Sequence, residues 1–174
     1  MRIVTIHASN PFATPDDQRS LVRRLRGRLP SPVTLWTAGS GPDRAGLTVS
    51  SALVVDGDPG RVLGIIGDEA DLWTSVQATK RFALIQLDSE DRQVADRFAG
   101  LLPAPGGPFR VGEWEQTDYG PVPAARTWAG CRLDDARPYG WGQLVEASIE
   151  VITFASTGDV LAHVAGRYRD IPLE

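Results

Sequence analysis

The stretch Gly46-Leu47-Thr48-Val49-Ser50-Ser51 is the most informative part of the sequence. It runs on through apolar residues, and its composition predicts a strand over residues 47–55. Because side chains alternate across a strand, Thr48 and Ser50 point to one face and Ser51 to the other. Buried hydroxyls need partners, which a phosphate or the polar edge of a heterocycle would supply. The β propensity of threonine and bonding of serine to the backbone explain the same pattern.

The rest of the chain reads as strands with a few helices at their edges. Further strands are predicted at residues 33–38, 61–66, 81–87, 124–133, 143–154 and 160–164, with a turn at residues 156–159 joining the last two as a hairpin. Helices are predicted after caps at Thr14, Asp68 and Ser89. Strands outnumber helices and do not alternate with them, which favours an all-β barrel or sandwich with peripheral helices.

Length and composition indicate one compact unit. The chain has 174 residues, of which 42% are hydrophobic, enough for a single core. We expect an N-terminal strand and helix extension over residues 1–31 and one domain over residues 32–174. The net charge of −4 argues against nucleic-acid binding, and the apolar runs are too short to span a membrane. A single cysteine, Cys131, fits a reducing, cytoplasmic location, and the Cys and His residues are too few for a typical zinc site.

Several local patterns suggest chemistry but have simpler interpretations. Residues 38–46 contain G-x-G after a strand, but a strand-like segment follows where a dinucleotide site needs a helix. His7 and His163 have no serine or cysteine partner at a diagnostic spacing. The arginine-rich helix near residues 19–28 is typical of a solvated face, with anion binding as the alternative. The aromatic turn around Trp141 is a candidate border for a planar ligand.

Five segments in order resemble the flavin reductase-like, FMN-binding split-barrel family. The segment G-x-T-V-S-S at residues 46–51 follows PVTLWTA at residues 32–38, which is the opening signature of that family. Residues 80–87 (KRFALIQL), 95–100 (ADRFAG), 121–131 (PVPAARTWAGC) and 164–168 (VAGRY) are similar to its later motifs. The likeness covers roughly residues 32–168.

The resemblance implies a six-stranded split β-barrel that forms a homodimer with FMN at the interface. It implies an NAD(P)H:flavin oxidoreductase, with FAD as an alternative flavin and a monooxygenase as a partner. By position in the motifs, the residues implied to contact flavin are Thr48, Val49, Ser50, Ser51, Gln86, Arg167 and Tyr168. Gln86 stands where the family commonly has asparagine. No catalytic residue is assigned.

Two departures from the family pattern leave other functions open. Where members often carry a polar N-R-S-S-S-T segment near the phosphate, this chain has Asp68, Glu69 and Asp71, whose charge opposes a phosphate unless Lys80 or an arginine holds it. Many reductases carry a histidine before the strand at residues 144–151, and residues 139–144 contain none. The alternatives are a flavin-binding carrier without catalysis and a deazaflavin-dependent split-barrel enzyme.

Overall fold

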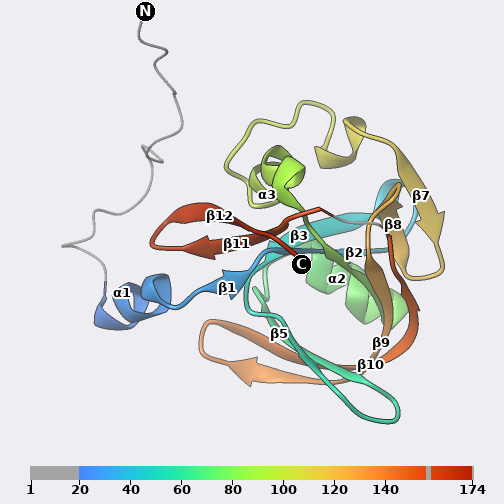
Figure 1. The fold of residues 1–174 in the computed structure, drawn as a ribbon. Helices are drawn as coiled ribbons and strands as arrows, with labels where there is room; N and C mark the ends of the chain where they lie inside the picture. Colours follow the sequence, from blue (N-terminus) through green and yellow to red (C-terminus); the bar gives the residue numbers. More distant parts are fainter. Residues whose placement is uncertain (1–19, 156–157, 174) are drawn as a thin grey trace, which may run out of the picture.

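The main architecture is one curved antiparallel sheet with small helices packed around it. The computed structural model describes residues 20–155 and 158–173 (Figure 1). The order of the sheet is β3 (Ala45–Val49), β2 (Thr34–Ala38), β6 (Arg81–Gln86), β9 (Trp128–Tyr139), β10 (Gly142–Thr153), β5 (Arg61–Ile66) and β4 (Leu53–Val55). Two small sheets accompany it, β1 (Ser31–Pro32), β11 (Val160–Val164) and β12 (Arg167–Ile171) in one, and β7 (Trp114–Thr117) with β8 (Gly120–Pro123) in the other. The helices are α1 (Leu21–Arg28), α2 (Asp71–Thr79) and α3 (Arg92–Phe98), with short 3₁₀ turns η2 (Gly41–Asp43), η3 (Ser89–Asp91) and η4 (Pro108–Arg110).

The sheet curls into an incompletely closed barrel, which confirms the predicted fold class. The predicted strand over residues 47–55 divides into β3 and β4, so the main sheet has seven strands. Ser51 lies in the break between them, and its hydroxyl accepts from the Ile65 amide at 3.0 Å and donates to the Ile65 carbonyl at 3.1 Å. The ladder between β4 and β5 would continue to this pair of residues, since Leu53 pairs with Leu63. A side chain therefore replaces the backbone pairing at this point.

The two faces of the sheet carry separate apolar clusters. Inside the barrel, the rings of Trp36 and Phe82 stack with their centroids 4.5 Å apart. A Cβ atom at Gly64 would lie 2.4 Å from Trp36 Cη2, so glycine is what lets β5 approach this ring. On the outer face, Leu35 and Phe98 belong to a second buried cluster that α3 covers. The central strands β2 and β6 are thus buried from both sides.

The predicted hairpin between the last two strands is wrong. β10 pairs with β9 and β5, whereas β11 pairs with β1 and β12 in another sheet. The Leu161 side chain is buried in the outer cluster, and its backbone groups bond to the Val33 amide and the Leu87 carbonyl, both at 3.0 Å. Packing over the outer face therefore draws this strand away from β10.

Two of the three predicted helix starts need correction. Asp68 does not cap α2, whose N-cap residue is Ala70, with no side-chain hydrogen bond at the cap. Ser89 is not a cap; Asp88 caps η3 by accepting from the Glu90 amide at 3.2 Å, and α3 follows. Asp91 completes a capping box by accepting from the Asp88 amide at 3.1 Å, which fixes the helix start at Asp88. Ser20 caps α1 by accepting from the Arg23 amide at 3.2 Å. Thr14 lies outside the described residues. Within residues 20–155 and 158–173, no helix is long and apolar enough to cross a membrane.

Candidate functional site

The hydroxyl-bearing segment after β3 has two of its three hydroxyls bonded within the chain. Thr48 Oγ1 donates to the Ala95 carbonyl of α3 at 2.7 Å, on the outer side of the sheet. Ser51 bonds to β5, as described above. Thr48 thus points to the outer face, whereas Ser51 lies in the break and takes the place of a backbone pair, so the predicted alternation does not extend to it. Ser50 is half-buried and forms no side-chain hydrogen bond to another described residue. It is the hydroxyl of this segment that stays available.

Gln86 and Val49 belong to a single row across three strands inside the barrel. Thr34 pairs with Gln86 on one side and with Val49 on the other. The Thr34 hydroxyl donates to the Val49 carbonyl at 2.6 Å and accepts from the Trp36 indole at 3.1 Å. The side-chain nitrogen of Gln86 is buried without a hydrogen-bond partner among the described residues. An amide left in this state costs free energy, so Gln86 is an unsatisfied donor at one end of the barrel interior.

Arg167 and Tyr168 lie on β12, beside α3. The Tyr168 hydroxyl donates to Asp96 Oδ1 at 2.7 Å, and burial together with this bond raises the pKa of Tyr168. Because Thr48 bonds to Ala95 and Tyr168 to Asp96, consecutive residues of α3 bring these two predicted site residues to one helix. The Arg167 side chain is exposed. The structure therefore groups Thr48 with Tyr168 outside the sheet, and Val49 with Gln86 inside it.

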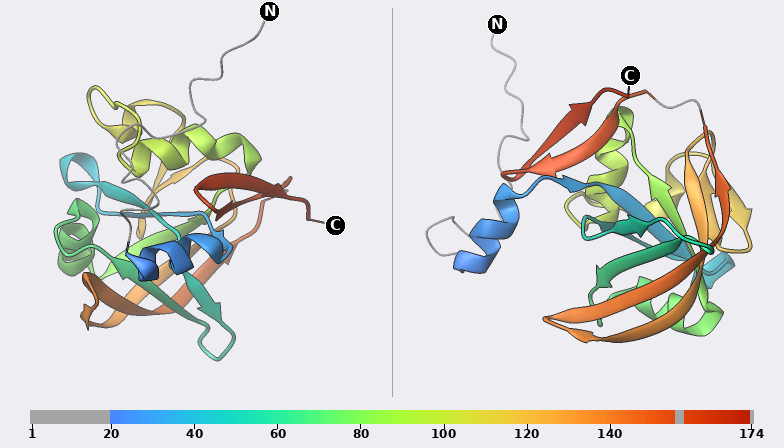
Figure 2. Two further views of the ribbon diagram at one scale, coloured as in Figure 1. Left: turned by 90° about the vertical axis from the view of Figure 1, so that its left-hand side faces the viewer. Right: turned by 60° about the horizontal axis from the view of Figure 1, so that its bottom comes forward.

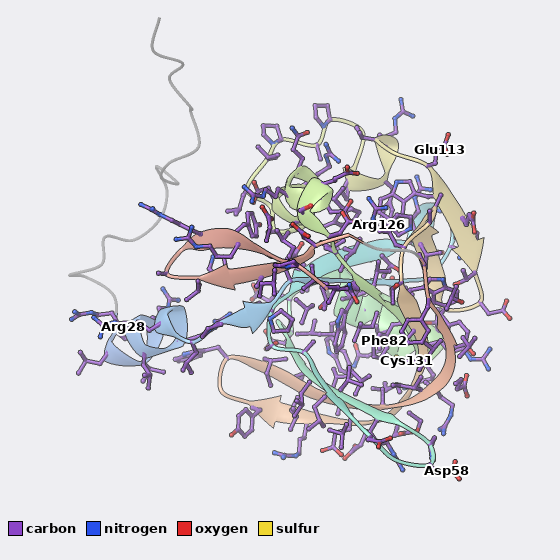
Figure 3. The ribbon with its side chains drawn as sticks, viewed as in Figure 1. Arg28, Asp58, Phe82, Glu113, Arg126 and Cys131 are labelled. Atoms are coloured by element: carbon purple, nitrogen blue, oxygen red, sulfur yellow. The ribbon has the colours of Figure 1, made fainter. Side chains whose placement is uncertain are left out.

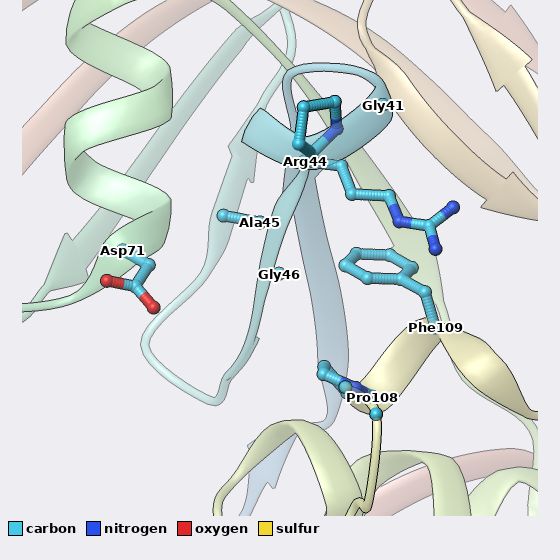
Figure 4. Close-up of a pocket in the computed structure, with 10 residues that line it drawn as sticks. Gly41, Arg44, Ala45, Gly46, Asp71, Pro108 and Phe109 are labelled. Carbon is cyan, nitrogen blue, oxygen red and sulfur yellow. The ribbon is translucent and has the colours of Figure 1, made fainter.

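A pocket of about 310 Å³ adjoins the start of β3 (Figure 4). Its walls come from η2, the first residues of β3, the start of α2 and the loop over residues 106–109. The Arg44 guanidinium lies over the Phe109 ring, 5.0 Å from its centroid, and Asp71 stands on the opposite wall. Gly46 faces the Phe98 and Phe109 rings, since a Cβ atom there would lie 2.7 Å from Phe98 Cε1 and 3.2 Å from Phe109 Cζ. Sequence reasoning missed this pocket, although Gly106 and Gly107 mark its loop.

The acidic segment borders this pocket. Asp71 is the first residue of α2 and Asp68 and Glu69 precede it, all exposed. Lys80 caps the other end of this helix, nine residues along, so it is not the cation at the pocket. Arg44 is the cation that lines the pocket, and it faces Asp71 across it. An anionic group bound here would meet Arg44 favourably and Asp71 unfavourably.

Of the remaining candidates from the sequence, Trp141 projects into solvent and His163 packs beside Tyr168. Trp141 is 99% exposed in the turn between β9 and β10, next to Gly142, which packs on the Ile66 carbonyl of β5. His163 is half-buried against Tyr168, and burial together with the charge of Arg26 lowers the pKa of its imidazole. His7 lies outside the described residues. Within the described ranges, no group of three His, Cys, Asp or Glu side chains is arranged to hold a metal ion.

The arrangement is thus an incompletely closed barrel with a hydroxyl-bearing break beside β5. The family model described as "Flavin reductase like domain" matches residues 26–172. The chain therefore belongs to the flavin reductase-like domain family, which confirms the resemblance seen in its motifs. The comparison with curated protein sequences gives no match.

Solved structures of flavin reductases share the fold over almost the whole chain. The NADH:FAD oxidoreductase SgcE6 of Streptomyces globisporus C-1027 has a TM-score of 0.79 at 23% identity, covering 93% of this chain and 98% of that one. BorF, the flavin reductase component of a bacterial two-component tryptophan halogenase, has 0.76 at 23%, covering 88% and 99%. The styrene monooxygenase flavin reductase SMOB of Pseudomonas putida S12 has 0.77 at 16%, covering 89% and 99%.

Proposed function

We propose that this protein is an FMN-binding NAD(P)H:flavin oxidoreductase that works as a homodimer. Its membership of the flavin reductase-like family carries this proposal. Bound flavin would supply the redox chemistry, by accepting a hydride from the nicotinamide. The contribution of the chain is to bind the ring, orient it and set the polar groups around it.

The proposed flavin contacts centre on the break after β3. β3 is the last strand of the sheet on its side, so alternate backbone groups of Thr48 and Val49 point away from β2. Ser50 adds a free hydroxyl, whereas Ser51 holds β5 in place beside it. These donors suit the carbonyl and nitrogen acceptors along the polar edge of an isoalloxazine ring.

Gln86, Arg167 and Tyr168 complete the proposed contacts. The buried amide of Gln86 is a donor that a bound polar group would satisfy. Tyr168 positions α3 through Asp96, and α3 in turn holds Thr48. Arg167 is an exposed cation on the same strand as Tyr168. For the phosphate, Arg44 at the neighbouring pocket is the proposed cation, because it lines that pocket at the start of β3, and FAD is the alternative flavin.

Two observations bear on the nicotinamide and on the alternative functions. SgcE6 is named as an NADH:FAD oxidoreductase, which supports NAD(P)H as the co-substrate here. Residues 139–144, where many members carry a histidine, instead comprise the end of β9, a turn with the exposed Trp141, and the start of β10. This departure favours the second candidate, a flavin-binding module without hydride transfer. The acidic residues at the pocket make a polyanionic deazaflavin a less suitable ligand than FMN.

Several named structural relatives act in two-component systems. BorF and SMOB are the reductases of a halogenase and a monooxygenase, respectively. By analogy, we propose that reduced flavin formed here passes to an oxygenase partner. The homodimer rests on the exposed apolar surfaces described in the next subsection.

Flavin titration followed by turnover tests this proposal. FMN, FAD and a deazaflavin are titrated into the purified protein by fluorescence quenching, and NADH and NADPH oxidation is then measured with each bound flavin. Ser50→Ala is expected to weaken FMN binding about tenfold, the effect of one lost hydrogen bond in a buried site. Ser31→Ala, on β1, is the matched control and is expected to bind FMN like the wild type.

The outcomes separate the candidate functions. Binding with NAD(P)H turnover supports the reductase. FMN binding without turnover selects the carrier, and tighter binding of the deazaflavin selects the third alternative. If none of the three flavins binds, the proposed function is wrong. If FMN binds equally well to Ser50→Ala, the assignment of the β3 break is wrong.

A further inference from the structure

Helix α1 carries an apolar stripe that the described chain does not cover. Leu21, Val22 and Leu25 are 61–77% exposed, and Leu29 at the C-cap is 59% exposed. No residue of this helix is buried. Figure 2 shows α1 standing clear of the curved sheet. A stripe of this kind on an eight-residue helix gains nothing from folding unless another surface packs against it.

The last turn of the helix is nevertheless tied to the rest of the chain. The Gly27 carbonyl accepts from the Ala165 amide in the turn between β11 and β12 at 2.6 Å. This bond anchors the end of α1, whereas the described residues leave the apolar stripe uncovered.

A groove of matching chemistry lies between β4 and the end of β10. Its volume is about 640 Å³, and its apolar walls are Val54, Val55, Ile149, Val151 and Ile152. All three residues of β4 are exposed, by 41–59%, although β4 is an edge strand. An exposed apolar edge of this kind invites association, so native proteins usually cover it.

The charges at the two surfaces are complementary. Arg26 and Arg28 flank the apolar stripe of α1 along the helix, given the spacing of helical residues. Asp56 lines the groove, and Asp58 lies in the same turn between β4 and β5, both exposed. An amphipathic helix seated in an apolar groove, with opposite charges at the rim, is a common recognition mode.

The helix cannot fill the groove of its own chain. Figure 3 places Arg28 at one side of the molecule and Asp58 at the tip of the turn on the far side. We propose that α1 of one copy docks into the β4–β10 groove of a second copy, and that the second α1 docks reciprocally. Two-fold symmetry then doubles each contact and uses both surfaces fully. This inference gives the homodimer proposed above its contacting elements.

Cysteine crosslinking tests the contact directly. Leu25→Cys and Val54→Cys are combined in one chain and oxidised at low protein concentration. A disulfide-linked dimer is expected, because each copy offers both ends of the contact. Cys131 is buried and does not compete. Leu25→Cys combined with Leu101→Cys, which is also exposed, is the matched control and is expected to stay largely unlinked.

Charge reversal and sedimentation provide the second arm. Arg28→Asp is expected to weaken the dimer on the order of tenfold, and adding Asp58→Arg to restore it. A wild-type chain that stays monomeric at all concentrations overturns the dimer itself. If the dimer forms but the Leu25→Cys and Val54→Cys pair does not crosslink, and Leu25→Glu leaves the dimer unchanged, only the docking of α1 is overturned. If the crosslink fails, and the protein binds anionic lipid vesicles but its Leu25→Glu variant does not, the helix is assigned to a membrane surface instead. Flavin binding is measured separately on each variant. A failure of the proposed flavin function can therefore be told apart from a failure of the proposed α1 docking.

Discussion

The central strands β2 and β6 and the peripheral elements α1 and β4 contain similar apolar residues but differ in what covers them. Trp36 on β2 is fully buried, with Phe82 of β6 stacked on it. Leu25 on α1 and Val54 on β4 are about as apolar and are mostly exposed. The chain therefore completes its own core around the central strands. At its periphery it leaves apolar surface that the described residues do not cover.

The same contrast holds for polar groups. Arg126 forms two hydrogen bonds to Asp91, at 2.7 and 3.0 Å, and lies 3.3 Å from Asp88, all largely buried. Gln86, in contrast, is buried with a side-chain donor that has no partner in the described residues. The buried charges around Arg126 are thus satisfied within the chain. The Gln86 donor, unpaired among the described residues, lies in the segment that we propose to contact flavin.

The largest expected effect tests whether the two regions differ energetically. Trp36→Ala is expected to lower the free energy of unfolding by about 3–5 kcal/mol, because a large buried ring is removed from a packed core. Leu25→Ala is expected to change it by less than about 0.5 kcal/mol. Denaturant titrations followed by circular dichroism, at concentrations where the chain is monomeric, give both values. Similar losses for the two variants would show that α1 packs on its own chain.

A smaller effect sharpens the comparison for buried charges. Arg126→Met is expected to destabilise the protein by about 2 kcal/mol at pH 7, because two carboxylates lose the cation that compensates their burial. The Arg92–Asp170 pair is much more exposed, so Arg92→Met is expected to cost less than about 1 kcal/mol.

The loss of stability in Arg126→Met is expected to depend on pH. Burial and the neighbouring Asp91 raise the pKa of Asp88. A protonated carboxyl no longer needs the guanidinium, so the difference between wild type and Arg126→Met is expected to shrink as the pH falls from 7 towards 4. Unfolding free energies measured across this range check the sign. A difference that grows on acidification would contradict the assigned role of Arg126.

Strand positions followed from the sequence where apolar periodicity and turn residues agreed. The strand over residues 61–66 is found with the same bounds in β5. The strand over residues 47–55 is interrupted, because the Ser51 hydroxyl takes the place of backbone pairing with Ile65. The hairpin at residues 156–159 failed because the destination of β11 depends on packing of Leu161 far along the chain. Local patterns predict a turn but not the partner of the strand that follows it.

The candidate site was proposed from the sequence as a segment, and the free groups in it could not be identified there. The motif at residues 46–51 was predicted within one continuous strand, and the structure instead has a break between β3 and β4 at its end. Only tertiary structure shows that Thr48 bonds to Ala95, 47 residues along, and that the Ser50 hydroxyl bonds to no other described residue. The pocket at Phe109 was missed because it joins a loop, a helix start and a strand that no sequence motif connects. Likewise, the stripe on α1 is visible in the sequence, but its exposure is not.

The smallest expected effect concerns Gln86, the exception inside the well-packed region. Gln86→Leu removes the unpaired donor and keeps most of the volume, so flavin-free protein is expected to gain about 1 kcal/mol of stability. If bound flavin satisfies this amide, the same variant is expected to bind FMN about five- to tenfold more weakly. Gln77→Leu, on the exposed side of α2, is the control for the change in side-chain type. A residue that serves binding but destabilises the fold is expected to show this pattern: its replacement raises the stability and lowers the affinity. If the variant gains stability but binds FMN as tightly as the wild type, the assignment of Gln86 to the flavin site is wrong. Its unpaired amide would then be a packing defect of the barrel interior.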